Sequence, residues 1–158
     1  MATTISHSPA ETAALGERFG RAASYGLVIG LSGDLGAGKT QFVHGLARGL
    51  DIPARVHSPT FALVNTYAGG RLALFHLDLY RLDTLEQIAA AGLEEYLRPA
   101  GITVIEWAER WLGEVQSLKP KVQGLPSGVS GSSPPLCWVR IEVLSETERR
   151  ITYEYPGA

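Results

Sequence analysis

The segment Gly33-Asp-Leu-Gly-Ala-Gly-Lys-Thr40 has the residue types and the spacing of a phosphate-binding loop. It matches the pattern G-x-x-x-x-G-K-[ST], in which glycines let backbone N–H groups approach phosphate oxygens closely. Lys39 is expected to reach the β- and γ-phosphates, and Thr40 to place its hydroxyl on Mg²⁺. The N–H groups of residues 35–40 are expected to line a concave anion site. The predicted nucleotide-binding residues of this loop are Gly33, Asp34, Leu35, Gly36, Ala37, Gly38, Lys39 and Thr40.

Two acidic residues stand where a carboxylate could act on a bound nucleotide. Asp78 lies in the apolar run Phe75–Arg81, where alternation places it on the same strand face as His76. Glu106 directly follows the apolar run 102–105, at the carboxyl end of an expected strand, which is where open α/β sheets bind ligands. We predict that Asp78, Glu106 and Lys39 are catalytic and that Thr40, Glu106 and Asp78 surround the metal. The sequence leaves open which acid touches Mg²⁺ and which orients water, and we interpret His76 as structural.

The elements expected around the loop follow from hydrophobic periodicity. Residues 27–32 predict a buried strand before the loop. A helix is expected from Lys39 to about Gly49, with Phe42, Val43, Leu46 and Leu50 inside. An earlier helix over residues 11–24 should bury Leu15, Phe19 and Ala22. The strand–loop–helix context is the one that the phosphate-binding pattern requires.

The rest of the chain predicts further strands and short helices. Strands are expected at 61–67 and 72–80, joined at Gly69-Gly70, then at 102–105, and in a last hairpin of 136–144 and 150–155. Asp83 and Glu86 fit a capping box for a helix that ends near Ala91, and residues 107–112 read as helical. We predict an α/β P-loop NTPase fold in three layers, with a mixed, mainly parallel sheet and antiparallel edge strands. Residues 1–158 are expected to form a single domain that carries a flexible Gly/Ser/Pro-rich insertion at about 119–135.

Composition excludes several classes of protein. The net charge of −2 and the pI of about 6.1 disfavour a domain that grips a nucleic-acid backbone by charge alone. Cys137 is the only cysteine, which rules out an internal disulfide and a multi-cysteine zinc site. The N-terminus lacks a signal-peptide pattern, and no run approaches the roughly 18 apolar residues that span a bilayer. We expect a cytoplasmic protein without a membrane segment.

Four motifs in order give the sequence a family resemblance: the loop 33–40, Ser58-Pro-Thr-Phe61, His76-Leu-Asp-Leu-Tyr-Arg81 and Ile105-Glu-Trp107. Together they resemble the TsaE (YjeE) family over roughly residues 9–112. The resemblance implies a Mg²⁺-dependent ATPase that binds ATP or ADP and works with two partner proteins, TsaB and TsaD. Those partners modify adenosine 37 with a threonylcarbamoyl group in tRNAs that read codons starting with A. The chain would therefore serve tRNA indirectly, through its partners.

The resemblance also implies roles for residues beyond the loop. Ser58 and Thr60 match a switch-like segment near the nucleotide, and Trp107 matches the tryptophan that follows the glutamate. The segment around Pro9 to Thr12 would lie near the nucleoside, so Thr12 is a candidate contact, as is a basic residue of the last hairpin, Arg149 or Arg150. The region 113–135 departs from the family, which usually runs quickly from the Glu-Trp helix into a short turn and a strand.

Two other functions stay open from the residues alone. A small-molecule kinase would use the same loop, but it usually carries an arginine-bearing lid, and no Arg-rich segment stands out. A nucleotide-dependent binding module would use the loop without meaningful turnover. A substrate screen and a nucleotide-dependent pull-down, respectively, would distinguish these from the ATPase.

Overall fold

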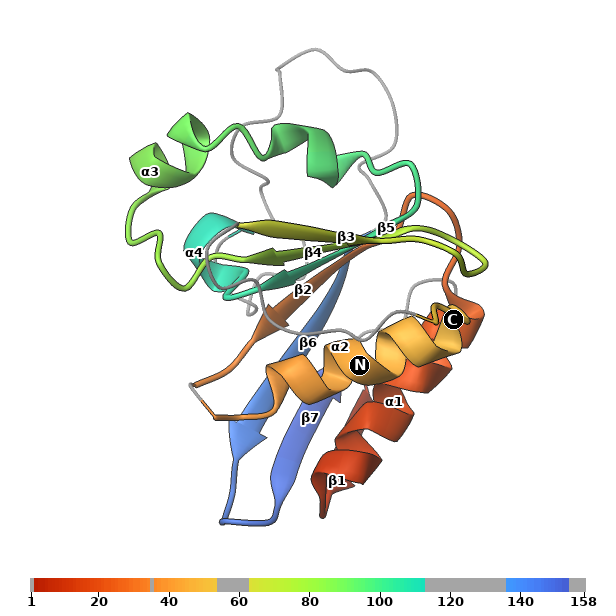
Figure 1. Cartoon of the computed structure of the whole chain (residues 1–158). Coiled ribbons are helices and arrows are strands. Elements are labelled where there is room, and N and C mark those ends of the chain that lie inside the picture. The colour runs from red at the N-terminus through yellow and green to blue at the C-terminus, as the bar shows by residue number, and fades with distance from the viewer. Residues whose placement is uncertain (1, 35, 54–62, 113–135, 154–158) are drawn as a thin grey trace.

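The computed structural model describes residues 2–34, 36–53, 63–112 and 136–153. These residues form a seven-stranded mixed sheet in the order β1-β7-β6-β2-β5-β4-β3, with helices on both faces (Figure 1). The elements, in chain order, are β1 (Ala2–Ser6), α1 (Pro9–Ala22), β2 (Val28–Ser32), α2 (Lys39–Gly49), β3 (Val64–Tyr67), β4 (Leu74–Asp78), α3 (Leu85–Ala90), the 3-10 helix η1 (Glu94–Leu97), β5 (Ile102–Glu106), α4 (Glu109–Leu112), β6 (Leu136–Val143) and β7 (Arg149–Tyr153). The predicted α/β class with a mixed sheet is confirmed.

The centre of the sheet is parallel and its edges are antiparallel. Strand β2 pairs in parallel with both β5 and β6, and β4 pairs in parallel with β5. Strand β3 runs antiparallel to β4 at one edge, and β7 and β1 run antiparallel at the other. Every residue of β2 is buried, as expected of a strand covered on both faces. Because β2, β4 and β5 are parallel, their carboxyl ends meet at one edge of the sheet.

Two hydrophobic clusters pack against the opposite faces of the sheet. On one face, α1 and α2 contribute side chains such as Leu15, Phe19, Phe42 and Leu46. On the other face, α3, η1 and α4 supply Ile88, Leu97, Trp111 and Leu112, and Leu93, just before η1, joins them. Figure 1 shows the two helical layers with the sheet between them. Burying a side chain of this size contributes roughly 1.5–3 kcal/mol, so both layers hold the central strands in place.

Helices α1 and α2 approach each other closely at four glycines. A Cβ added at Gly45 would lie 1.7 Å from the carbonyl oxygen of Ala13, and one added at Gly16 would lie 2.1 Å from that of Phe42. Gly20 and Gly49 have similar backbone neighbours across the interface, at 2.4 and 2.1 Å. Backbone contact of this kind needs residues without a Cβ, and it fixes α1 against the helix that follows the phosphate-binding loop.

Several expectations about local structure were wrong. Strand β1 was not predicted, yet Ala2–Ser6 pairs with β7 along the sheet edge. Ala22 is exposed and Ala23 is buried in its place. The capping box lies one residue later than predicted, since the Thr84 hydroxyl accepts from the Gln87 N–H at 3.1 Å and the Gln87 side chain bonds back to Thr84.

Some expectations lie outside the described residues, among them the start of the strand at 61–67, the insertion at 119–135 and the end of the last strand. Within the part of the chain that the structure describes, no helix has the length and apolar character needed to cross a membrane.

Candidate nucleotide site

The loop at the carboxyl end of β2 turns the chain back into α2 through glycines. Gly33 has a φ of +149°, and a Cβ there would lie 2.4 Å from the carbonyl oxygen of Ile141. Gly38 stands just before α2 with a φ of +104°, a conformation that favours glycine, and it has no side chain to cap the helix. The N-terminus of α2 therefore faces the loop, where the helix dipole favours an anion. The Ala37 N–H donates to the Asp34 carbonyl at 3.0 Å, so this amide already closes a turn within the loop.

Lys39, the first residue of α2, is buried beneath the loop. Its Nζ donates to the carbonyl oxygens of Gly33 at 2.5 Å and Asp34 at 2.9 Å, and it lies 4.0 Å from the centre of the Trp107 ring. Burial lowers the pKa of the Lys39 amine, although nearby carboxylates, Glu106 first among them, oppose that shift. The ammonium is thus held by weak acceptors, which a phosphate oxygen could replace.

The two predicted acids lie side by side, as the strand register requires. Asp78 ends β4 and is paired with Glu106 at the end of β5, so both side chains leave the same face of the sheet. The hydroxyl of Thr40, on α2, donates to Oε1 of Glu106, on β5, at 3.3 Å. Asp78 accepts from the Tyr80 N–H at 3.0 Å. Burial raises the pKa of Asp78, and the charge of Glu106 adds to that rise.

His76 contacts one of these acids directly. Its Nε2 lies 2.5 Å from Oε2 of Glu106, and both side chains are buried. His76, which we interpreted from the sequence as structural, therefore has its hydrogen-bond partner in the site. Alternation placed His76 on the face of Asp78, but the contact with Glu106 depends on the register of β4 against β5, which sequence periodicity does not give.

Trp107 makes the chain turn sharply after β5. It has a φ of +62°, which is rare for a bulky residue and costs roughly 1–3 kcal/mol. The turn is held by the Ala108 N–H, which donates to the Leu31 carbonyl at 3.1 Å. It brings the indole over Lys39 and next to the Tyr80 ring, with ring centres 5.3 Å apart, while the Arg110 guanidinium lies 4.9 Å from the indole centre. Trp107 thus forms one wall of the site.

These groups surround a cavity of about 460 Å³ beside the loop. Of the residues predicted from the sequence, it brings together Thr12, Gly36, Ala37, Gly38, Lys39, Thr40, Asp78, Glu106 and Trp107. Gly33 and Asp34 contact Lys39 from behind. Leu35, Ser58 and Thr60 lie outside the described residues.

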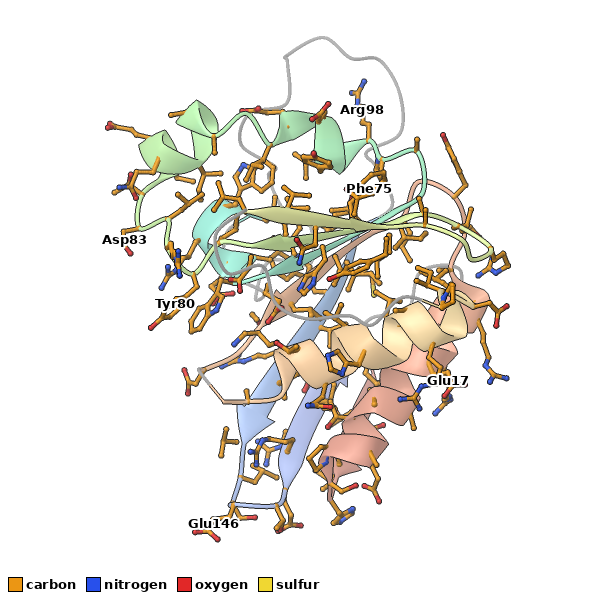
Figure 2. All side chains as sticks on the ribbon, viewed as in Figure 1. Glu17, Phe75, Tyr80, Asp83, Arg98 and Glu146 are labelled. Atoms are coloured by element: carbon orange, nitrogen blue, oxygen red, sulfur yellow. The ribbon has the colours of Figure 1, made fainter. Side chains whose placement is uncertain are left out.

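The cavity has further lining residues that the sequence did not single out. They are Ser8, Gln41, Tyr80, Glu146 and Thr147. Figure 2 shows Tyr80 beside the end of β4 and Glu146 at the tip of the β6–β7 hairpin, so the walls come from strands that lie on the two sides of β2 in the sheet. Sequence periodicity could not have found them, because they gather only through the strand order.

The structure also places the remaining candidate contacts, which are Arg149, Arg150 and Thr12. Arg149 lines the cavity, where its guanidinium donates to the carbonyl oxygens of Ala37 at 3.1 Å and Gly36 at 3.3 Å. Arg150 instead pairs with Glu142 at 3.5 Å, on the outer strand surface. Thr12 is buried beside the loop, but its hydroxyl lies 2.7 Å from that of Ser6.

Comparison with known proteins identifies the family. Residues 6–126 match the model of the family "Threonylcarbamoyl adenosine biosynthesis protein TsaE". The chain is 46% identical over 111 residues to the protein of that name from Treponema pallidum, an alignment that covers 70% of this chain and 82% of the relative. It is 48% identical over 99 residues to the Synechocystis protein, covering 60% of this chain and 62%, less than two thirds, of that relative. The crystal structure of YdiB from Bacillus subtilis superposes with a TM-score of 0.71 at 31% identity, over 99% of this chain and 86% of the other. The chain therefore belongs to the TsaE family.

Proposed function

We propose that this chain is a Mg²⁺-dependent ATPase that supports threonylcarbamoyl modification of adenosine 37 in tRNAs reading codons that start with A. It would act through a partner transferase complex of TsaB and TsaD and would reach tRNA only through them. The family description, threonylcarbamoyl adenosine biosynthesis, supports the pathway. A single P-loop ATPase domain over residues 1–158, working in the cytoplasm, is part of the same proposal.

The observation that carries the proposal is the meeting of one buried lysine, one hydroxyl and two carboxylates in a single cavity. Lys39 and Thr40 come from the start of α2, whereas Asp78 and Glu106 come from the ends of β4 and β5. Lys39 would release the carbonyls of Gly33 and Asp34 and contact the β- and γ-phosphates of ATP. Arg149 adds a second positive charge at the cavity wall. A polyphosphate is the ligand whose charge this arrangement complements.

The residues present fit a magnesium ion that is shared with the nucleotide. Among the described residues no group of three or more His, Cys, Asp or Glu side chains gathers as a metal site. Mg²⁺ commonly takes one or two protein oxygens and fills its remaining positions with water and substrate phosphates. The Thr40 hydroxyl and Oε1 of Glu106, 3.3 Å apart, supply such oxygens. When bound, the ion would supply positive charge that offsets the negative charge of the phosphates during transfer.

Asp78 is better suited to the attacking water. Burial raises the pKa of its carboxyl, which makes it a stronger proton acceptor than an exposed aspartate. Its neighbour Glu106 faces Thr40 and so would lie on the metal side. We therefore assign the metal contact to Glu106 and the orientation of water to Asp78, with slow turnover expected for the chain alone.

A phosphate-release assay tests the proposal. The purified chain, ATP and Mg²⁺ should release phosphate slowly, and adding TsaB and TsaD should raise the rate. Transfer of phosphate to a metabolite instead of water would favour a small-molecule kinase. Tight ATP-dependent association with the partners and no release of phosphate would favour a binding module.

A further inference from the structure

A buried histidine that the proposed reaction does not use lies against the proposed metal ligand. His76, on β4, is fully buried, and Glu106, on β5, is 3% exposed. The Nε2 atom of His76 lies 2.5 Å from Oε2 of Glu106. Within the described part of the chain, Nδ1 of the same ring is buried and has no hydrogen-bond partner. The ring is therefore directed at one acceptor, the Glu106 carboxylate.

The geometry fixes which ring nitrogen carries the proton. A carboxylate only accepts hydrogen bonds, so the nitrogen that faces it must donate. An N–H at Nδ1 would be a buried donor without an acceptor, which costs more than a buried lone pair. The proton therefore belongs on Nε2. The bond engages Oε2 of Glu106, while Oε1 is the oxygen nearer the Thr40 hydroxyl, at 3.3 Å against 3.5 Å.

We infer that His76 is a positioning residue that orients Glu106 toward the metal, an inference that rests on the proposed function. The bond to Oε2 restrains rotation of the carboxylate and leaves Oε1 directed at Thr40. The buried ammonium of Lys39 attracts the same carboxylate, since the charge of Glu106 opposes the lowering of the Lys39 pKa by burial. Without His76, Glu106 would turn toward Lys39 and away from the metal position. Hydrogen-bonding partners of this kind commonly tune metal ligands.

Two substitutions that differ by one methylene test the inference. In His76→Gln, the amide nitrogen reaches the place of Nε2 and keeps the donor to Glu106. In His76→Asn, the shorter amide stops near the place of Nδ1 and loses it. The apparent affinity for Mg²⁺ should fall about 10- to 100-fold in His76→Asn. It is measured by titrating Mg²⁺ into phosphate-release assays and into calorimetry of ATP-analogue binding. His76→Gln should restore most of that loss, and nucleotide binding without Mg²⁺ should be similar in both.

A double-mutant cycle separates positioning from packing. If His76 acts through Glu106, His76→Asn should cause no further loss of apparent Mg²⁺ affinity in a Glu106→Gln background. An equal effect in both backgrounds, or equal losses in His76→Asn and His76→Gln, would overturn the inference. Wild-type affinity for Mg²⁺ in His76→Asn would overturn it while leaving the proposed function intact. A wild-type chain that binds no nucleotide would remove both.

A spectroscopic test needs no substitution at His76, in case His76→Asn fails to fold. In a long-range ¹H–¹⁵N spectrum the wild-type His76 ring should be protonated at Nε2, and its signals should shift in Glu106→Gln. A ring protonated at Nδ1 alone, or signals that ignore Glu106→Gln, would contradict the contact on which the inference stands.

Discussion

Replacing Lys39 by methionine separates two effects of its buried charge. The side chain is only 5% exposed, and methionine is similar in length but carries no charge. The substitution removes hydrogen bonds to the Gly33 and Asp34 carbonyls, at 2.5 and 2.9 Å, and the contact with the Trp107 ring. It also removes the cost of keeping an ammonium away from water, the cost that lowers the Lys39 pKa. We therefore expect little change in the stability of the free protein.

Nucleotide binding should respond much more strongly. A unit charge about 4 Å from a phosphate charge is worth about 4 kcal/mol at an effective dielectric constant of about 20. To make this contact, Lys39 must give up its hydrogen bonds to the two carbonyl oxygens. A hydrogen bond to a charged group contributes roughly 1.5–3 kcal/mol, so the loss of these bonds offsets part of the attraction to phosphate. The net loss should be about 2 kcal/mol, which corresponds to a roughly 30-fold rise in Kd.

Fluorescence anisotropy with a labelled ADP and Mg²⁺ measures this change. Arg48→Met is a matched control, because Arg48 lies near the end of the same helix with an exposed side chain outside the cavity. It removes the same charge and should leave Kd within about twofold, since exposed charges are strongly screened. Equal Kd values for Lys39→Met and the wild type would refute the assignment of Lys39 to phosphate.

Three further predictions concern the acids and the helix interface. Glu106→Gln should lower the rate of single-turnover phosphate release more than about 100-fold, which is the size of effect seen when one catalytic electrostatic group is removed. The Kd for ADP without Mg²⁺ should stay within about threefold of the wild-type value. Asp78→Asn should raise the Tm of the free protein at neutral pH by a few degrees at most. Burial raises the pKa of Asp78 in the folded state, so the ionised carboxylate destabilises the wild type at neutral pH. The gain in Tm from Asp78→Asn should therefore shrink as pH falls through the folded-state pKa, and it should vanish below the pKa of Asp78 in the unfolded chain. An unchanged difference between pH 7 and pH 3 in thermal melts would contradict it. Gly45→Ala should destabilise the protein by about 1–3 kcal/mol in urea unfolding, since its Cβ would lie 1.7 Å from the Ala13 carbonyl oxygen. An unaltered free energy of unfolding would show that α1 and α2 can separate at low cost.

The parts of the fold that sequence predicted well were those with local signals. The apolar run before Gly33 and the spacing of Phe42, Val43 and Leu46 are enough to place β2, the loop and α2. The placement of Glu106 at the end of a strand was also correct, because strand termini are readable from neighbouring residues, whereas β4 ends at Asp78, two residues earlier than the expected strand.

The parts that sequence missed depend on contacts between distant segments. Strand β1 is an edge strand with no apolar run of its own, and it forms because β7 offers it a partner. The bond from His76 to Glu106 depends on the register of β4 against β5, which no local pattern encodes. The positive φ of Trp107 likewise follows from the turn that places its indole against Lys39, a residue distant in sequence.

Whether the cavity beside the loop binds nucleotide can be measured by calorimetric titration of the purified chain with ADP in the presence of Mg²⁺. We expect saturable binding at a single site per chain, weakened by Lys39→Met and left unchanged by Arg48→Met. A titration without binding heat at several temperatures, on a chain shown to be folded, would contradict the claim that the cavity beside Gly33–Thr40 is a nucleotide site.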